Sequence, residues 1–140
     1  MCERRPQEEA VLMTIRARHI RNMRRGRKRW ELRKTRPKIV PPFRVHLCES
    51  GSGGKVTAMF TCPEILDVTD LPADQIAKMA CITREEVEDY RAKGRGRLYA
   101  WIIDRFYDKR PGLWVNHITD YGVNRPPQSW CYTREAITDA

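Results

Sequence analysis

Residues 43–61 limit the possible folds of this chain more than any other segment. Every second residue is apolar over residues 43–47 and again over residues 56–60, a spacing that turns one face of a strand toward a core. A glycine-rich turn at residues 51–54 separates the two runs, and glycine tolerates the backbone of a tight hairpin turn. The sequence therefore predicts an antiparallel hairpin, with His46 half-exposed on its first strand.

Apolar patterning predicts further strands and helices around this hairpin. Helices are expected at residues 18–25, 70–79 and 83–93, strands at residues 98–103 and 113–118, and a strand or a helix at residues 11–15. Gly26 is expected to end the helix at residues 18–25, and Gly94 is expected to end the helix at residues 83–93. Thr83 with Glu86 matches a capping box at the start of the helix at residues 83–93. This order predicts a small mixed sheet, or a barrel with helices on its outside.

The positive charge of the chain is concentrated in one segment. The whole sequence carries a net charge of +9, but residues 16–38 alone hold twelve Lys or Arg and a single acid, Glu31, a net charge of +11. Such a local field attracts polyanions, because neutralising phosphates releases condensed counterions. The segment therefore predicts nucleic-acid binding, and the alternative is a solvated basic face that only keeps the protein in solution.

Within that segment, residues 26–33 carry the most informative pattern. If residues 28–34 form a strand, Trp30 and Leu32 point to one face, whereas Arg29, Glu31 and Arg33 point to the other. A carboxylate between two guanidinium groups stays ionised and orients both groups before a ligand arrives. The pattern predicts a core-facing side and a polar binding side.

The C-terminal segment 121–132 contains a diproline followed by an amide, a hydroxyl and two aromatic side chains. Such a segment can place an aromatic platform and hydrogen-bonding groups against a flat ring. It can also be the last strand that closes a barrel, because Trp and Tyr are common in cores. The sequence leaves both interpretations open.

Composition bounds the class of protein. Five cysteines without Cys-x-x-Cys spacing and three scattered histidines argue against a zinc site or a disulfide framework, and no metal or cofactor is expected. No apolar run approaches the roughly 20 residues of a membrane helix, and no signal peptide is recognisable. We therefore expect a cytoplasmic protein with reduced thiols and no membrane partner.

The length of 140 residues, with 41% apolar residues, suits one globular domain. We expect a disordered N-terminal extension at residues 1–10, the domain at residues 11–133 and a C-terminal tail at residues 134–140. Met13 is an alternative start of the chain.

Gly26, Lys28, Glu31 and Arg33 match the four fixed positions of the signature Gly-x-Lys-x-x-Glu-x-Arg. In this respect the chain resembles the ASCH domain family, a branch of the PUA-like superfamily, over residues 11–133. The resemblance implies an α+β fold, a small PUA-like mixed β-barrel of about five or six strands with two or three helices packed outside. It also implies a cleft lined by the signature strand that binds RNA or a modified nucleotide.

The resemblance and the charge pattern together give a set of candidate ligand-binding residues. Those in and beside the signature are Arg25, Arg27, Lys28, Arg29, Glu31 and Arg33, and the positional additions are Ser50, Gln128, Ser129 and Trp130.

The resemblance also implies an enzymatic alternative. Some ASCH proteins remove the acyl group from nucleosides such as 4-acetylcytidine, with a lysine, a threonine three residues later and a separate glutamate. Here Lys28 matches the lysine, Glu31 occupies the threonine position, and residues 79–81, where the glutamate would fall, contain no carboxylate. If the chain is an enzyme, an amidohydrolase or a ribonuclease, Lys28 and Glu31 are the candidate catalytic residues.

Overall fold

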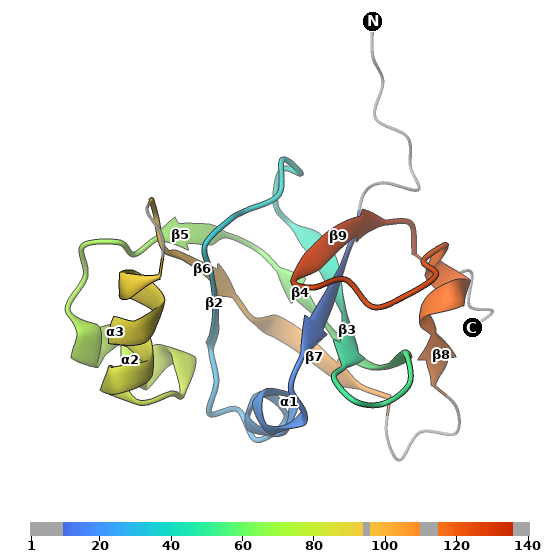
Figure 1. Ribbon diagram of the computed structural model, residues 1–140, viewed down its shortest axis with the longest axis horizontal. Helices are drawn as coiled ribbons and strands as arrows, with labels where there is room; N and C mark the ends of the chain where they lie inside the picture. The colour runs from blue at the N-terminus through green and yellow to red at the C-terminus, as the bar shows by residue number, and fades with distance from the viewer. Residues whose placement is uncertain (1–9, 94–95, 110–114, 136–140) are drawn as a thin grey trace, which may run out of the picture.

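The computed structural model describes residues 10–93, 96–109 and 115–135 (Figure 1). The first half contains β1 (Ala10–Ile15), α1 (Ala17–Arg24), β2 (Trp30–Arg33), β3 (Phe43–Glu49), β4 (Lys55–Cys62) and β5 (Ile65–Asp67). The second half contains α2 (Ala73–Ala80), α3 (Arg84–Ala92), β6 (Tyr99–Ile102), β7 (Asp104–Asp108), β8 (Asn116–His117), the 3-10 helix η2 (Ile118–Tyr121) and β9 (Trp130–Thr133).

A mixed sheet of six strands forms the larger of the two sheets in the described residues. Its order is β7-β4-β3-β1-β9, and β8 pairs with the start of β4. Strands β1 and β3 run parallel, whereas the other neighbours run antiparallel. Parallel neighbours need a long connection, and here that connection contains α1 and β2. The basic segment therefore leaves the large sheet and returns to it.

A second, antiparallel sheet has the order β2-β6-β5 and carries the helical hairpin α2–α3 (Figure 1). The start of α3 has the predicted capping box. The Thr83 hydroxyl accepts a hydrogen bond from the Glu86 backbone N–H at 3.0 Å, and the Glu86 carboxylate accepts one from the Thr83 backbone N–H at 3.0 Å. This reciprocal pair fixes the position of the first turn of α3.

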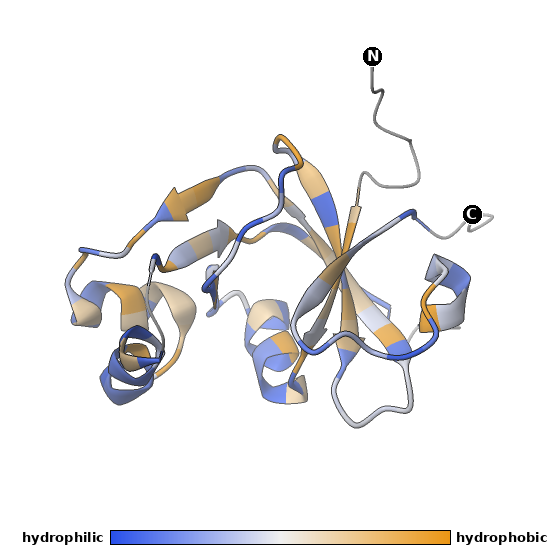
Figure 2. Ribbon diagram, turned by 45° about the horizontal axis from the view of Figure 1, so that its top comes forward, coloured by the Kyte–Doolittle hydropathy of each residue, from blue (hydrophilic) through white to orange (hydrophobic). Residues whose placement is uncertain are grey.

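Side-chain alternation distributes the core on both faces of the large sheet. Val11 and Met13 of β1 join a buried cluster with Trp101, which links the two sheets, whereas Leu12 joins a smaller cluster with Ile118 on the opposite face. In Figure 2 the helices carry both hydrophobic and hydrophilic colouring, as expected for elements that cover a core with one side.

The predicted hairpin is confirmed as β3 and β4, with Val45 opposite Phe60. Its turn requires glycine at one position. Gly54 has a φ of +90°, and a Cβ atom there would lie 3.0 Å from the His117 ring. The first predicted helix is also confirmed as α1, and Gly26, with a φ of +73°, follows its C-cap residue.

The predicted α+β class is confirmed, but the described strands number nine and lie in two sheets. The sequence does not predict β5 or β7. Strand β5 has only three residues, and β7 carries three charged residues among its five, so neither shows a recognisable alternation. The apolar run at residues 98–103, predicted as a central strand, is β6, which is central in the three-stranded sheet.

His46 and the predicted strand at residues 113–118 need correction. His46 is buried, with 4% of its surface exposed, because Tyr121 packs against its ring at a centroid distance of 4.8 Å. Residues 113–114 of this predicted strand lie outside the described residues. In the described part, the strand comprises Asn116–His117, and Ile118 already begins η2.

Other predictions fall on residues at the edges of the described ranges. Residues 1–9, 94–95, 110–114 and 136–140 lie outside the described residues, so the predicted extension, the Gly94 helix end and most of the predicted tail lie there. Ala10, assigned above to the extension, is the first residue of β1.

Candidate functional site

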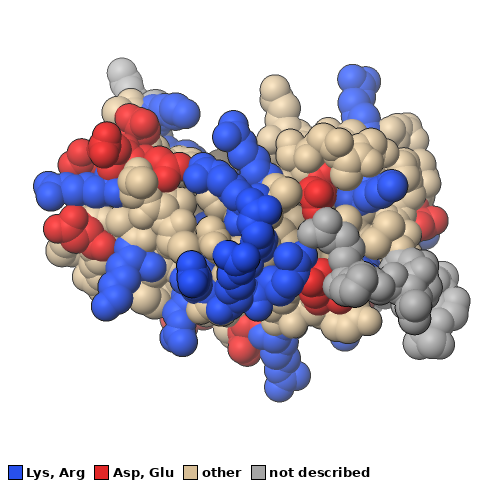
Figure 3. All heavy atoms as spheres, turned by 90° about the horizontal axis from the view of Figure 1, so that it is seen from below, with Lys and Arg blue, Asp and Glu red and all other residues tan. Residues whose placement is uncertain are grey.

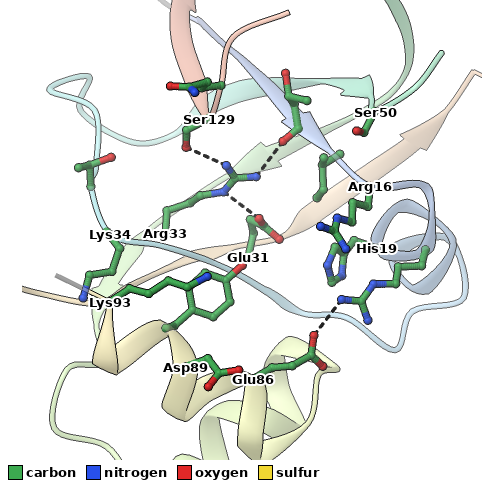
Figure 4. Close-up of a pocket in the computed structure, with 16 residues that line it drawn as sticks. Arg16, His19, Glu31, Arg33, Lys34, Ser50, Glu86, Asp89, Lys93 and Ser129 are labelled. Atoms are coloured by element: carbon green, nitrogen blue, oxygen red, sulfur yellow. Dashed lines mark hydrogen bonds and ion pairs between the residues drawn. The ribbon is translucent and has the colours of Figure 1, made fainter.

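A hollow of about 660 Å³ opens between α3, the end of β1, the start of α1, β2 and the segment before β9 (Figure 4). Its walls are polar and of mixed charge. The lining residues are Thr14, Ile15, Arg16, Arg18, His19, Glu31, Arg33, Lys34, Thr35, Ser50, Glu86, Asp89, Tyr90, Lys93, Gln128 and Ser129.

Strand β2 positions the central residues of this hollow. Trp30 and Leu32 pack in an apolar cluster with α2 and α3, while Glu31 and Arg33 lie on the opposite side of the strand and line the hollow. This is the alternation that the sequence predicts. In Figure 4 the Glu31 carboxylate lies near the middle of the site, with Arg33 beside it.

Glu31 is the centre of a buried ion cluster. Its Oε2 atom lies 2.8 Å from Nε of Arg33, and its Oε1 atom lies 3.2 Å from Nζ of Lys28. Glu31 and Lys28 are 4% and 3% exposed. One cation is therefore an ammonium, not a second guanidinium as the sequence pattern predicts, because Arg29 points outward and is exposed.

These cations keep Glu31 ionised. Burial by itself would raise the pKa of the Glu31 carboxyl, but the Lys28 ammonium and the Arg33 guanidinium outweigh it and hold the pKa below its usual value. Lys28 also donates a hydrogen bond of 2.8 Å to the Ala80 backbone carbonyl at the end of α2.

Arg33 joins β2 to the C-terminal segment. One terminal nitrogen of its guanidinium donates to the Ser129 hydroxyl at 2.8 Å, and the other donates to the Thr14 carbonyl at 3.1 Å. The Thr14 hydroxyl in turn donates to the Pro127 carbonyl at 2.7 Å. Each of the three guanidinium nitrogens of Arg33 thus has a partner, and the side chain links β2 to the end of β1 and to the segment before β9.

Helix α3 forms the opposite wall. Its residue Glu86 forms an ion pair of 2.8 Å with Arg18 of α1. The backbone hydrogen bond from Thr83, together with Arg18, lowers the pKa of Glu86 to about 2. Burial, and then the negative charge of Glu31, raise the pKa of Tyr90 on the same wall.

His19 is a site residue that the sequence analysis does not single out. Burial, and then the nearby Lys28 ammonium, lower its pKa to about 4, so its ring is neutral at neutral pH. Its position on α1, three residues after Arg16, gives no local motif. Only the packing of α1 against residues 28–31 reveals it.

The structure brings together five of the residues proposed from sequence and leaves the others outside the hollow. Glu31, Arg33, Ser50, Gln128 and Ser129 line it. Lys28 lies beneath it, in a smaller pocket that also involves His19 and Glu31.

Trp130 is placed differently from the other C-terminal candidates. Its ring packs edge-on against Trp101 at a centroid distance of 5.6 Å, and its indole N–H donates to the Thr35 hydroxyl at 2.9 Å. Trp130 is the first residue of β9, which pairs with β1. Of the two interpretations of the C-terminal segment, the one that makes it a last strand therefore describes Trp130.

The remaining candidates lie on the outer surface. Figure 3 shows the face on which α1 lies, where Lys and Arg side chains gather in a band across the middle. We use the name basic band for the five exposed arginines that follow Arg18 in α1 and the next turn, Arg21, Arg24, Arg25, Arg27 and Arg29. Arg24 is paired with Asp108, and within the described residues the other four have no ion pair.

Three further observations concern metals, membranes and cysteines. Within residues 10–93, 96–109 and 115–135, no group of three or more His, Cys, Asp or Glu side chains is placed to hold a metal ion. Among the same residues, no helix combines the length and the apolar character of a membrane span. The described cysteines, Cys48, Cys62, Cys81 and Cys131, are free thiols.

The two sheets, the helical hairpin and the polar hollow define an α+β domain. No protein-family model matches the sequence, and no curated protein matches it. Solved structures of the ASCH protein ZmASCH from Zymomonas mobilis do share the fold.

A serine-to-alanine mutant of ZmASCH superposes with a TM-score of 0.75 at 16% identity, covering 94% of this chain and 93% of that one. A tyrosine-to-phenylalanine mutant gives 0.73 at 16% identity, with coverages of 91% and 92%. The ASCH structure without a stated mutation gives 0.68 at 17% identity, with coverages of 91% and 90%. The chain therefore has the fold of an ASCH domain, as the signature at Gly26 to Arg33 suggests.

Proposed function

We propose that this chain is a nucleic-acid-binding protein that binds RNA, with phosphates on the basic band and one nucleotide in the hollow. The observation that carries this proposal is the continuity of the two features. Arg16 and Arg18 line the hollow, and the basic band continues from them along α1 and the following turn. A strand of RNA can therefore contact both with consecutive nucleotides.

The charge state of the basic band supports the proposal. Most of its guanidinium groups have no ion pair within the described residues, so their charge is available to phosphates. Guanidinium forks match phosphate oxygens in geometry, and each neutralised phosphate releases counterions.

The hollow supports the proposal by its size and by its polar groups. A volume of about 660 Å³ lies within the range of pockets that enclose drug-sized ligands, and a nucleotide is a ligand of that size. The Tyr90 ring on one wall and the Glu31 carboxylate at the centre offer a stacking surface and a hydrogen-bond acceptor.

Fluorescence anisotropy titration tests the proposal, with labelled single-stranded and structured RNA at several salt concentrations. We expect binding whose logarithmic affinity falls linearly with the logarithm of salt concentration. Absence of binding at low salt, or an affinity that does not respond to salt, would contradict the proposal.

A charge variant localises the phosphate contacts. The combined Arg25→Ala, Arg27→Ala and Arg29→Ala substitution should weaken RNA binding at least tenfold and lower the salt slope by about 2, since each single-strand phosphate contact contributes about 0.7. The matched control removes the same charge elsewhere, as Lys78→Ala, Arg84→Ala and Arg97→Ala, all outside the hollow and the basic segment. Equal losses in both triple variants would show that only net charge matters.

An enzymatic function is the second candidate, either amide hydrolysis of an acylated nucleoside or RNA cleavage. The buried Lys28–Glu31 pair next to a neutral imidazole favours it, because such groups can move protons. For the amidohydrolase, Lys28 contacts the Ala80 backbone carbonyl at the place where the resemblance implies a carboxylate, which weakens that alternative.

Incubation with 4-acetylcytidine and with labelled RNA separates these activities. Turnover by the unsubstituted protein that is lost in folded Lys28→Ala and Glu31→Gln variants would favour an enzyme, and its absence would favour binding alone. The cytoplasmic location expected from the cysteines stays part of the proposal.

A further inference from the structure

His19 lies between the hollow and the buried ion cluster. Its side chain lines the hollow together with Glu31, and it also lines the small pocket beneath, together with Lys28 (Figure 4). It projects from α1, whereas Glu31 projects from β2, so the two side chains reach the same space from different elements.

The two nitrogens of the His19 ring are in different environments. Nδ1 is enclosed and has no hydrogen-bond partner within the described residues. Nε2 is not enclosed in this way, and it belongs to a side chain that lines the hollow. A neutral ring with its proton on Nε2 would therefore present an N–H donor to a ligand in the hollow.

Glu31 has hydrogen-bonding capacity left beside this donor. A carboxylate offers about four lone-pair sites, and Lys28 and Arg33 each occupy one, on different oxygens. The hollow thus presents a donor from His19 next to an acceptor from Glu31, on a floor that Arg33 and Lys28 hold rigid.

We propose that His19 and Glu31 together read the Watson–Crick edge of an unpaired nucleobase in this hollow. A base such as uracil presents an N–H beside a carbonyl on that edge, so its N–H donates to Glu31 while its carbonyl accepts from Nε2 of His19. This inference rests on the proposed RNA binding and adds which face of the base is contacted and by which two side chains.

The proposal implies that pairing or blocking that edge prevents occupation of the hollow. A methyl group on N3 of uracil removes the donor and leaves the Glu31 acceptor facing carbon, whereas a methyl group on C5 leaves the Watson–Crick edge intact. The lost hydrogen bond has a charged acceptor, and such a bond corresponds to at least about a tenfold change in affinity. The two methylated bases are therefore a matched pair of probes.

The experiment measures anisotropy with 10-nucleotide oligomers of uridine, 3-methyluridine and 5-methyluridine. We expect the unsubstituted protein to bind the 3-methyluridine oligomer about tenfold more weakly than the other two. His19→Phe should bind the uridine oligomer about tenfold more weakly, because the base carbonyl loses its donor, and His19→Asn, which keeps an N–H donor, should recover part of the loss. Circular dichroism checks that both variants are folded.

The protonation state of His19 sets the pH dependence expected for this contact. Because the pKa of His19 is about 4, its ring is uncharged at pH 6 and at pH 8, and its contribution to binding should be the same at both. Equal binding of all three oligomers, or unchanged uridine binding by folded His19→Phe, would overturn this inference while leaving RNA binding in place. Failure of every oligomer to bind in a salt-dependent manner would instead overturn the proposed function, and this inference with it.

Discussion

The buried ion cluster around Glu31 and the exposed basic band come from the same short stretch of sequence, yet they differ in solvent exposure and in ion pairing. In the cluster, Lys28 and Arg33 are within 3.2 Å and 2.8 Å of one carboxylate and have little access to solvent. In the basic band, Arg25, Arg27 and Arg29 are exposed and have no ion pair within the described residues.

The difference shows that charge in one segment can serve structure and recognition separately. Removing a charge from water is costly, so a buried charge needs a partner close by, and pairing makes its position rigid. An exposed charge costs little, moves freely and acts over a distance that salt shortens. The cluster is therefore suited to fix the shape of the hollow, and the basic band is suited to attract a polyanion.

Replacement of Glu31 should give the largest effect. Glu31→Gln leaves the Lys28 ammonium buried without its anion, and breaking a buried ion pair on one side typically costs about 3 kcal/mol. We expect the free energy of unfolding, measured by urea denaturation, to fall by about that amount. The control Glu88→Gln removes an exposed carboxylate from α3 and should change it by less than about 0.5 kcal/mol. Similar losses in both variants would erase the distinction between the two regions.

The stabilising effect of Glu31 should depend on pH in a defined direction. The folded state holds the pKa of Glu31 below the unfolded value near 4.5, so the folded state binds its proton less readily. The stabilisation is therefore complete above that pH and is lost as pH falls through the folded-state pKa. The difference in unfolding free energy between the unsubstituted protein and Glu31→Gln should be constant from pH 6 to 8 and shrink in strong acid. A difference that grows on acidification would contradict this assignment.

The smallest effect is expected at the boundary between the two regions. Arg18 pairs with Glu86 across the mouth of the hollow, but 46% of its side chain is exposed, so the pair contributes less than about 1 kcal/mol. Arg18→Ala should leave the thermal midpoint nearly unchanged, as should the control Arg84→Ala on the outer side of α3. A loss of stability in Arg18→Ala as large as that in Glu31→Gln would show that the wall of the hollow depends on this ion pair.

Local patterning predicts much of the fold and the orientation of β2. Alternation places Glu31 and Arg33 on the polar side, the Thr83 and Glu86 pair marks the start of α3, and the glycines mark the hairpin. These features depend on residues that are close in the sequence, so the sequence alone is sufficient to predict them.

The missing parts of the site depend on distant contacts. Lys28 contacts Ala80, which lies 52 residues later in the chain, and Arg33 contacts Ser129, which lies 96 residues later. The contribution of His19 arises because α1 packs beside β2, and no spacing within α1 indicates it. The acidic residues of the α3 wall could not be predicted as site residues either. Acids near the start of a helix are already expected from the helix dipole, so their presence does not indicate a site.

The hydrogen bond from Lys28 to the Ala80 carbonyl connects the buried ion cluster to the helical hairpin. It satisfies one of the carbonyls that the last turn of a helix leaves unpaired, and it does so with a positive charge at the negative end of α2. The same ammonium also contacts Glu31. A single charge therefore holds the floor of the hollow and the C-terminal end of α2 together, so the position of Glu31 depends on a helix that does not itself line the hollow.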